Sequence, residues 1–222
     1  MAANGNAFGG DVSVLLNRGD GTFENHVRYN VGDRPESVAL ADFDGDLDMD
    51  MAVAVFLDNS VGVLLNNGDG SFAPTTLYPT GNGATSVAIG DFDRDLDPDL
   101  AVANRSSSSV SVLLNQGAGT FAPHVSYPTS LFSEDVIVGD FDHDQDLDLA
   151  VANHGDSVSV LLNRGDGTFA PQRLYSAGSS PEGLAAGDFD RDGNLDIAIA
   201  NSFSDNVSIL LNRCLRGPRT PR

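Results

Sequence analysis

A repeat of 48 or 49 residues runs through the 222-residue chain. Its most distinctive part is a nine-residue segment with acidic residues at alternate positions, which begins at Asp42, Asp91, Asp140 and Asp188. An apolar run follows each segment: MAVAVF, LAVAN, LAVAN and IAIAN. Regular repeats of this length are typical of folds in which one supersecondary unit packs on the next. The repeat therefore constrains the fold more strongly than any other feature of the sequence.

Each repeat contains four short β-type runs separated by turn signals. In the second complete repeat these runs cover residues 86–92, 100–104, 110–115 and 124–129. The third and fourth runs are joined by NRGDGTF or a close variant, whose glycines allow the positive φ angles of a tight hairpin. No stretch shows a helical period with caps. The sequence therefore predicts an all-β fold.

Four-stranded antiparallel units at this spacing favour the blades of a β-propeller. A parallel solenoid would need a shorter repeat, and the chain has no tryptophan for the Trp-Asp signature of other propellers. Another all-β stack remains the alternative. We expect about four blades, with incomplete repeats at both ends. The expected propeller, 1–212, contains a partial unit 4–36, complete units 37–85, 86–134 and 135–182, and a partial unit 183–212.

The two ends of the chain are less regular. The start matches the end of an apolar run, so we expect the chain to be a piece of a longer array. Residues 213–222 form a basic segment that we expect to be disordered. With strands missing at both ends, the blades should form an open arc or a strained ring, and open edges would allow a homodimer.

The aspartate segments demand an explanation, because carboxylates this close together repel one another. A solvated acidic tract is the alternative, but it gives no reason for a fixed period. Calcium takes six to eight oxygen ligands with loose geometry, magnesium keeps more of its waters, and zinc prefers His or Cys. We therefore predict up to four Ca²⁺ ions. The candidate ligands occupy positions 1, 3, 5, 7 and 9 of each segment: Asp42, Asp44, Asp46, Asp48, Asp50; Asp91, Asp93, Asp95, Asp97, Asp99; Asp140, Asp142, Asp144, Asp146, Asp148; and Asp188, Asp190, Asp192, Asn194, Asp196.

The segments differ from an EF-hand, which needs a bidentate Glu at position 12 and flanking helices. Position 12 is Val or Ile here and falls inside a predicted strand. Position 6 favours glycine for a sharp turn, and only Gly193 supplies it. We therefore expect the fourth segment to bind most tightly and the other three to bind more weakly or with distorted geometry. All four segments join the first run to the second, so the ions should lie on one face.

The chain resembles the FG-GAP or VCBS repeats that form integrin-α-type propellers. The resemblance rests on VAIGDFD, VIVGDFD and AAGDFD before the aspartates, then on DLAVAN, VSVLLN and GDGTFAP, and it covers residues 4–212. It implies a calcium-binding propeller, usually extracellular or on the cell surface, that serves adhesion or the recognition of a protein or glycan ligand. Such propellers typically have seven blades.

The remaining features bear on function mainly by exclusion. The formal net charge of −20 argues against nucleic acid or an anionic membrane as partner. No run approaches the roughly 18 apolar residues of a transmembrane helix, and the N-terminus does not have the pattern of a signal peptide. No nucleophile–base pair stands out, so we expect no enzyme activity. The alternative is an accessory or carbohydrate-binding propeller of a larger secreted hydrolase or lyase.

One tyrosine recurs in the fourth run of each repeat, at Tyr29, Tyr78, Tyr127 and Tyr175. Such rings could stack on a sugar. Aromatic side chains also suit strands and pack well between sheets, and we prefer this interpretation.

Overall fold

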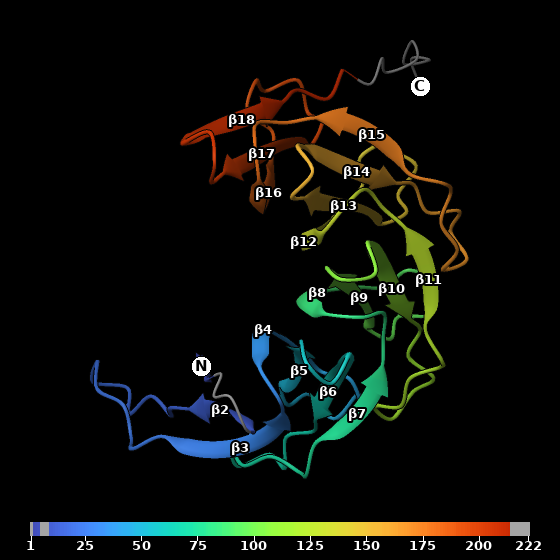
Figure 1. Cartoon of the computed structure of the whole chain (residues 1–222). Helices are drawn as coiled ribbons and strands as arrows, with labels where there is room; N and C mark the ends of the chain where they lie inside the picture. The colour runs from blue at the N-terminus through green and yellow to red at the C-terminus, as the bar shows by residue number, and fades with distance from the viewer. Residues whose placement is uncertain (1, 5–8, 214–222) are drawn as a thin grey trace.

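The computed structural model describes residues 2–4 and 9–213. Within this part of the chain every regular element is a β-strand. The strands form five antiparallel sheets, which follow one another in sequence and in space (Figure 1). The predicted all-β class and blade architecture are therefore confirmed. No helix long and apolar enough to cross a membrane occurs among the described residues.

Three sheets have four strands and two have three. The first contains β1 (Ala2–Asn4), β2 (Gly10–Val14) and β3 (Val27–Gly32). The second contains β4 (Pro35–Ala41), β5 (Asp50–Val55), β6 (Ser60–Leu64) and β7 (Thr76–Pro79). The third contains β8 (Ala84–Gly90), β9 (Asp99–Asn104), β10 (Ser109–Leu113) and β11 (Val125–Pro128). The fourth contains β12 (Ser133–Gly139), β13 (Asp148–Asn153), β14 (Ser157–Leu161) and β15 (Arg173–Ser176), and the fifth contains β16 (Pro181–Gly187), β17 (Asp196–Asn201) and β18 (Asn206–Leu210).

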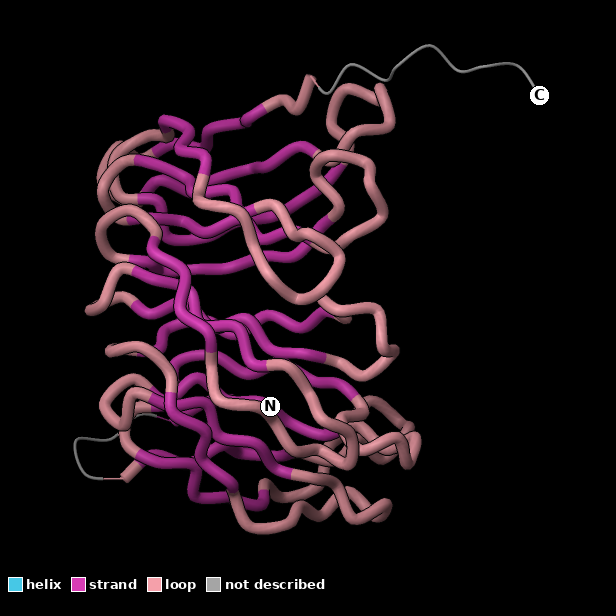
Figure 2. The backbone as a smooth tube through the Cα atoms, turned by 90° about the vertical axis from the view of Figure 1, so that its right-hand side faces the viewer, coloured by secondary structure: helices cyan, strands magenta, loops and turns pink. Residues whose placement is uncertain are grey.

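The five sheets are arranged as an open arc. Figure 1 shows β4, β8, β12 and β16 on its inner side and β7, β11 and β15 on its outer rim. In the perpendicular view the sheets stack on one another and the loops gather at the two ends of the strands (Figure 2). The first and last sheets share no strand pairing in the described chain, so the open arc is the form observed.

Hydrophobic clusters fill the four junctions between successive sheets. Because neighbours cover both faces, the second and third strands of the complete sheets, such as β9 and β10, are buried along their whole length. This is why the second strands, such as β9 with LAVA, contain an unbroken apolar run. The third strands, such as β10 with SVSVL, alternate valine with small serines that are also buried. In the fifth sheet, by contrast, Val207 and Ile209 are exposed, because no described sheet covers that face.

The repeated tyrosines pack between sheets. Tyr78 lies 5.3 Å from Phe121 and Tyr127 lies 5.4 Å from Phe169, measured between ring centroids, and both pairs are edge-to-face. Tyr29 contacts Phe72 in the same way at 5.4 Å. The packing interpretation is therefore confirmed for these three rings.

The basic tail predicted at 213–222 lies, apart from its first residue, outside the described residues.

Candidate metal centre

Each aspartate segment brings three carboxylates together, at positions 1, 3 and 9 of the segment. In every copy the three residues offer oxygen atoms that all lie within 4.8 Å of one another. We call each group a triad. The triads are Asp42, Asp44 and Asp50; Asp91, Asp93 and Asp99; Asp140, Asp142 and Asp148; and Asp188, Asp190 and Asp196.

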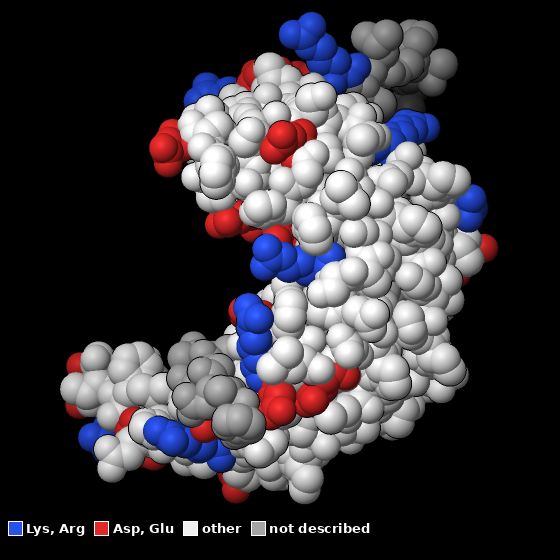
Figure 3. Space-filling model, viewed as in Figure 1, with Lys and Arg blue, Asp and Glu red and all other residues white. Residues whose placement is uncertain are grey.

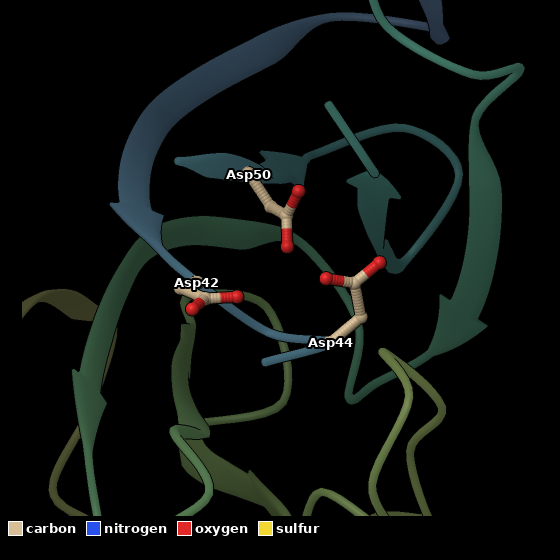
Figure 4. Close-up of side chains that lie close together, drawn as sticks. All are labelled: Asp42, Asp44 and Asp50. Carbon is tan, nitrogen blue, oxygen red and sulfur yellow. The ribbon is translucent and has the colours of Figure 1, made fainter. Parts of the chain in front are cut away.

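Strand geometry explains how these residues meet. Asp42 and Asp44 follow the end of β4, and Asp50 is the first residue of β5, its antiparallel neighbour. Figure 4 shows the three side chains converging on one space from the loop and from the strand. The loops, here called loop one (42–50), loop two (91–99), loop three (140–148) and loop four (188–196), therefore act as strand–loop–strand sites.

The carboxylate at position 9 also holds the backbone together. Asp99 is fully buried, and its two oxygens accept hydrogen bonds from the amides of Phe92 at 2.8 Å and Asn115 at 2.7 Å. Asp50, Asp148 and Asp196 accept the equivalent pairs of amides. This residue thus fixes both the start of its loop and the residues that follow the third strand.

Position 1 shapes the turn. One oxygen of Asp42 accepts the amide of Gly45 at 2.8 Å, and the other accepts the amide of Leu47 at 2.8 Å. The turn requires positive φ at positions 4 and 6, with values of 79° at Gly45 and 76° at Leu47. Position 6 has φ of 78° at Leu96, 74° at Gln145 and 84° at Gly193. The distorted geometry expected where glycine is missing is therefore not seen, and the non-glycine residues adopt the same strained backbone.

The carboxylates at positions 5 and 7 lie outside the triads. At position 5, Asp46 and Asp95 are exposed, and each accepts the amide two residues later at 2.9 Å. At position 7, Asp146 is buried and forms an ion pair with Arg94 of loop two. Asp46 and Asp95 at position 5 thus support the turns of their own loops, and Asp146 at position 7 supports the contact between loops two and three.

Burial and mutual repulsion perturb the triads. Burial raises the pKa of Asp99 to about 7 and that of Asp148 to about 6, although the hydrogen bonds from backbone amides oppose the shift. Burial also raises the pKa of Asp50, Asp44 and Asp93, and the carboxylates nearby raise it further. The site therefore disfavours its own negative charge, which is the condition that a bound cation relieves.

The donor set fits a hard divalent cation. Three carboxylates supply only oxygen, as Ca²⁺ and Mg²⁺ require, and no His or Cys joins any triad. In loops one, two and four, no described basic side chain pairs with a triad carboxylate. The charge is therefore left for an ion to neutralise.

The four loops lie side by side on one face, as their common position in the repeat predicts. Arg94 reaches from loop two to Asp146 of loop three, and His143 of loop three is hydrogen-bonded to Asn194 of loop four. Both contacts join position 4 of one loop to position 7 of the next. Sequence reasoning missed them, because the two positions lie about one repeat apart and are occupied by different residue types.

An asparagine at the end of each third strand was also missed. The side-chain amide of Asn115 donates to the carbonyl of Phe43 in loop one, at 3.0 Å, and to that of Pro98 in loop two, at 3.2 Å. Asn163 and Asn212 make the equivalent contacts between the later loops. The constant Asn of VSVLLN and VSILLN was the available signal.

Solved structures with similar folds support the blade architecture. An Agrocybe aegerita lectin described as recognising non-reducing terminal N-acetylglucosamine aligns with a TM-score of 0.56 and 21% identity over 92% of this chain and 63% of its own. The Vibrio cholerae biofilm matrix protein Bap1 aligns with a TM-score of 0.57 and 15% identity over 96% of this chain and 34% of its own. BBS1N, solved in complex with ARL6DN, aligns with a TM-score of 0.61 and 15% identity over 99% of this chain and 65% of its own.

This chain spans less than two thirds of each of these structures. At such identities the likeness concerns the fold. No curated protein sequence matches the chain significantly. The model of the FG-GAP-like repeat matches four times, at residues 2–53, 48–102, 91–151 and 140–199. These matches cover most of the sequence and coincide with the repeat units and their aspartate loops, and the chain therefore belongs to the FG-GAP-like repeat family.

Proposed function

We propose that this chain is a non-enzymatic recognition module whose four triads each bind one calcium ion. The observation that carries the proposal is the fourfold repetition of the same oxygen triad on one face. Four doubly charged ions would offset eight of the twenty excess negative charges of the chain. Each ion would also tie the start of its loop to the first residue of the strand that follows.

An extracellular or cell-surface location is part of this proposal. Calcium sites of extracellular modules commonly bind with dissociation constants of about 10⁻⁴ to 10⁻³ M. Sites with three carboxylates, two of them partly or fully exposed, fit weak binding of this kind better than the tight binding of intracellular buffers. Such sites would be filled where calcium is millimolar.

The opposite end of the sheets is the better candidate for ligand recognition in adhesion. Its turns expose Leu57, between β5 and β6, Leu131 and Phe132, between β11 and β12, and Phe203, between β17 and β18. Aromatic side chains such as Phe132 and Phe203 are enriched in protein interfaces. In this arrangement one face holds the ions and the other face meets the partner.

The test of calcium binding is thermal unfolding in metal-free buffer and in millimolar CaCl₂. Millimolar calcium is about one to ten times the dissociation constants of extracellular calcium sites and so stabilises the folded state by about 0.4 to 1.4 kcal/mol. In a domain of this size that corresponds to roughly 1 to 6 °C for each independent site. The same ionic strength supplied as KCl is the control. An equal rise in KCl would mean that salt merely screens the acidic loops, and would contradict the proposal.

A matched pair of variants tests the triad itself. Asp93→Asn removes a triad carboxylate, whereas Asp95→Asn changes an exposed carboxylate outside it. Calorimetry should give one ion fewer for Asp93→Asn and an unchanged number for Asp95→Asn. Loss of an ion in both variants would extend the ligand set to position 5.

The second candidate function is an accessory, carbohydrate-binding propeller of a larger secreted hydrolase or lyase. The likeness in fold to the lectin favours it. Binding to terminal sugars on a glycan array would support this candidate. A sugar-stacking role for the repeated tyrosines is disfavoured, because three of the four already pack against phenylalanine.

A further inference from the structure

A hydrophobic groove of about 630 Å³ lies between the fourth and fifth sheets. Its lining includes Phe141, Leu162 and Tyr175 from the fourth sheet and its loops, and Ile197 and Leu210 from the fifth. The groove lies beside β18, which pairs with β17 on one side and is the edge of its sheet on the other. Figure 1 shows this edge at the end of the arc, next to β14 and β15.

At the two junctions between complete sheets, a phenylalanine ring occupies the position that corresponds to the groove. In one of them Phe121 lies 5.5 Å from Phe43 and 5.3 Å from Tyr78, measured between ring centroids. In the next, Phe169 lies 5.6 Å from Phe92 and 5.4 Å from Tyr127. Phe141 and Tyr175 are the corresponding pair at the last junction, and both line the groove. The groove therefore lies where a phenyl ring packs at the two junctions between complete sheets.

The backbone beside the groove repeats the same arrangement. After the ring of Phe121, the amide of Ala122 donates to the carbonyl of Leu114 at 2.8 Å, and the chain then continues as β11 alongside β10. Ala170 and Leu162 make the equivalent bond at 2.8 Å. Leu211 is the counterpart of these leucines in the fifth sheet. It follows β18, whose free edge corresponds to the edges that β11 and β15 cover.

Three segments of this chain share the pattern that fills the equivalent places: residues 72–78, FAPTTLY; 121–127, FAPHVSY; and 169–175, FAPQRLY. The phenylalanines of all three segments already pack against tyrosines of other sheets, so none of these segments fills the groove.

We propose that the edge of β18 accepts an extended segment of a partner protein with the pattern Phe-Ala-Pro-x-x-x-Tyr. The segment adds as the fourth antiparallel strand of the fifth sheet, and its phenylalanine enters the groove between Phe141 and Tyr175. Strand addition of this kind takes affinity from backbone hydrogen bonds and specificity from the side-chain pocket. The groove lies between sheets, and its lining also includes Asp142, a carboxylate of the third triad.

The probe is a labelled synthetic peptide with the sequence of residues 164–177, RGDGTFAPQRLYSA. It is titrated into the full chain, and binding is measured by fluorescence anisotropy. We expect saturable binding. The same peptide with Phe169→Ala should bind at least tenfold more weakly, because burial of a phenyl ring contributes more than one factor of ten in affinity. A scrambled peptide should not bind.

Variants of the protein test whether the peptide binds in the groove. Tyr175 is 43% exposed, so Tyr175→Ala should fold normally and should weaken peptide binding about three- to tenfold through the lost ring contact. Phe23→Ala is the matched control, since Phe23 is 54% exposed and lies in the hairpin between β2 and β3, outside the groove lining. Melting curves confirm that both variants are folded.

Three results would overturn the proposal. One is the absence of saturable binding by the intact peptide. Another is equal binding by the Phe169→Ala or scrambled peptide, or by the Tyr175→Ala protein, which would mean non-specific adsorption. The third is self-association of the chain, seen by light scattering, that excess peptide reverses, because a second copy of the chain and not another protein would then occupy the groove.

Discussion

Loops two and four share the triad aspartates at positions 1, 3 and 9 but have different surroundings. In loop two, Phe92 is fully buried, and its carbonyl accepts hydrogen bonds from the side chain of Asn163 at 2.8 Å and the amide of Gly167 at 2.9 Å. Both donors belong to the next sheet. In loop four, Phe189 is 50% exposed, and Asp188 and Asp190 are exposed as well. Among the described residues no further sheet covers loop four.

This comparison separates two contributions to an ion site. The loop's own sequence determines the backbone strain in its turn. This contribution favours ion binding by loop four, because Gly193 adopts positive φ without strain. The neighbouring sheet determines how deeply the triad carboxylates are buried. This contribution favours ion binding by loop two, because the attraction between carboxylates and a cation strengthens as water is excluded. The expectation that loop four binds most tightly considered only the first contribution.

The largest difference should follow from truncating the phenylalanine at position 2. Phe92→Ala removes a ring that packs against Phe169 in a cluster of buried side chains, and should cost about 3 to 5 kcal/mol in the free energy of unfolding. Phe189→Ala removes a half-exposed ring and should cost less than about 1 kcal/mol. Urea denaturation of the two variants measures both values. Similar losses would mean that loop four is covered as well as loop two.

A smaller effect, equal in the two loops, is expected at position 9. Asp99→Asn and Asp196→Asn each leave a buried amide without a carboxylate acceptor, at a cost of about 1 to 3 kcal/mol. Both aspartates are fully buried. The loss should appear in metal-free buffer, because the hydrogen bonds do not involve an ion. An Asp196→Asn protein as stable as the parent chain would show that the two hydrogen bonds to the carboxylate at position 9 stabilise the protein only where a further sheet covers the loop.

The pH dependence of the metal-free protein should reflect the buried carboxylates. The pKa of Asp99 is raised to about 7 and that of Asp148 to about 6, from an ordinary value of 3.8. Between these limits the folded state binds more protons than the unfolded state, so stability is greatest at low pH and falls as the pH rises through 6 to 7.

Because calcium competes with these protons, the stabilisation by calcium should grow over the same pH range. Melting temperatures at pH 5 and pH 8, each with and without calcium, test both trends. The Asp99→Asn protein should show a flatter profile in metal-free buffer. A metal-free protein that becomes more stable as the pH rises from 5 to 8 would contradict the assignment.

The smallest effect concerns the turn at position 6. Leu96 has φ of 78° and is 87% exposed, so Leu96→Gly relieves backbone strain without loss of packing. We expect a gain of about 0.5 kcal/mol, since the relief of roughly 1 kcal/mol is partly offset by the greater freedom of glycine in the unfolded chain. Gly193→Ala should lose about 1 kcal/mol for the opposite reason. Thermal melting of both variants measures the effects, and a destabilised Leu96→Gly protein would argue against strain.

Much of this molecule was predictable from its sequence. Strand periodicity, hairpin glycines and the fixed repeat specify sheets such as β8–β11, because these signals depend on residues close together in the chain. The same local signals place an acidic loop between the first and second strands of each unit. They also indicate an ion site on one face, since every copy occupies the same place in its unit.

Only the tertiary structure decided which carboxylates meet. The alternating pattern offers five candidates in loop one, but the turn through Gly45 and Leu47 brings Asp42 and Asp44 to Asp50 and leaves Asp46 outside. That outcome depends on the pairing of β4 with β5, which the spacing of aspartates does not encode. The contact of Arg94 with Asp146 and the burial of loop two depend likewise on the next sheet. Local sequence thus determined the unit, and packing between units determined how strongly each site is buried, because burial is a property of neighbours about 50 residues away in the chain.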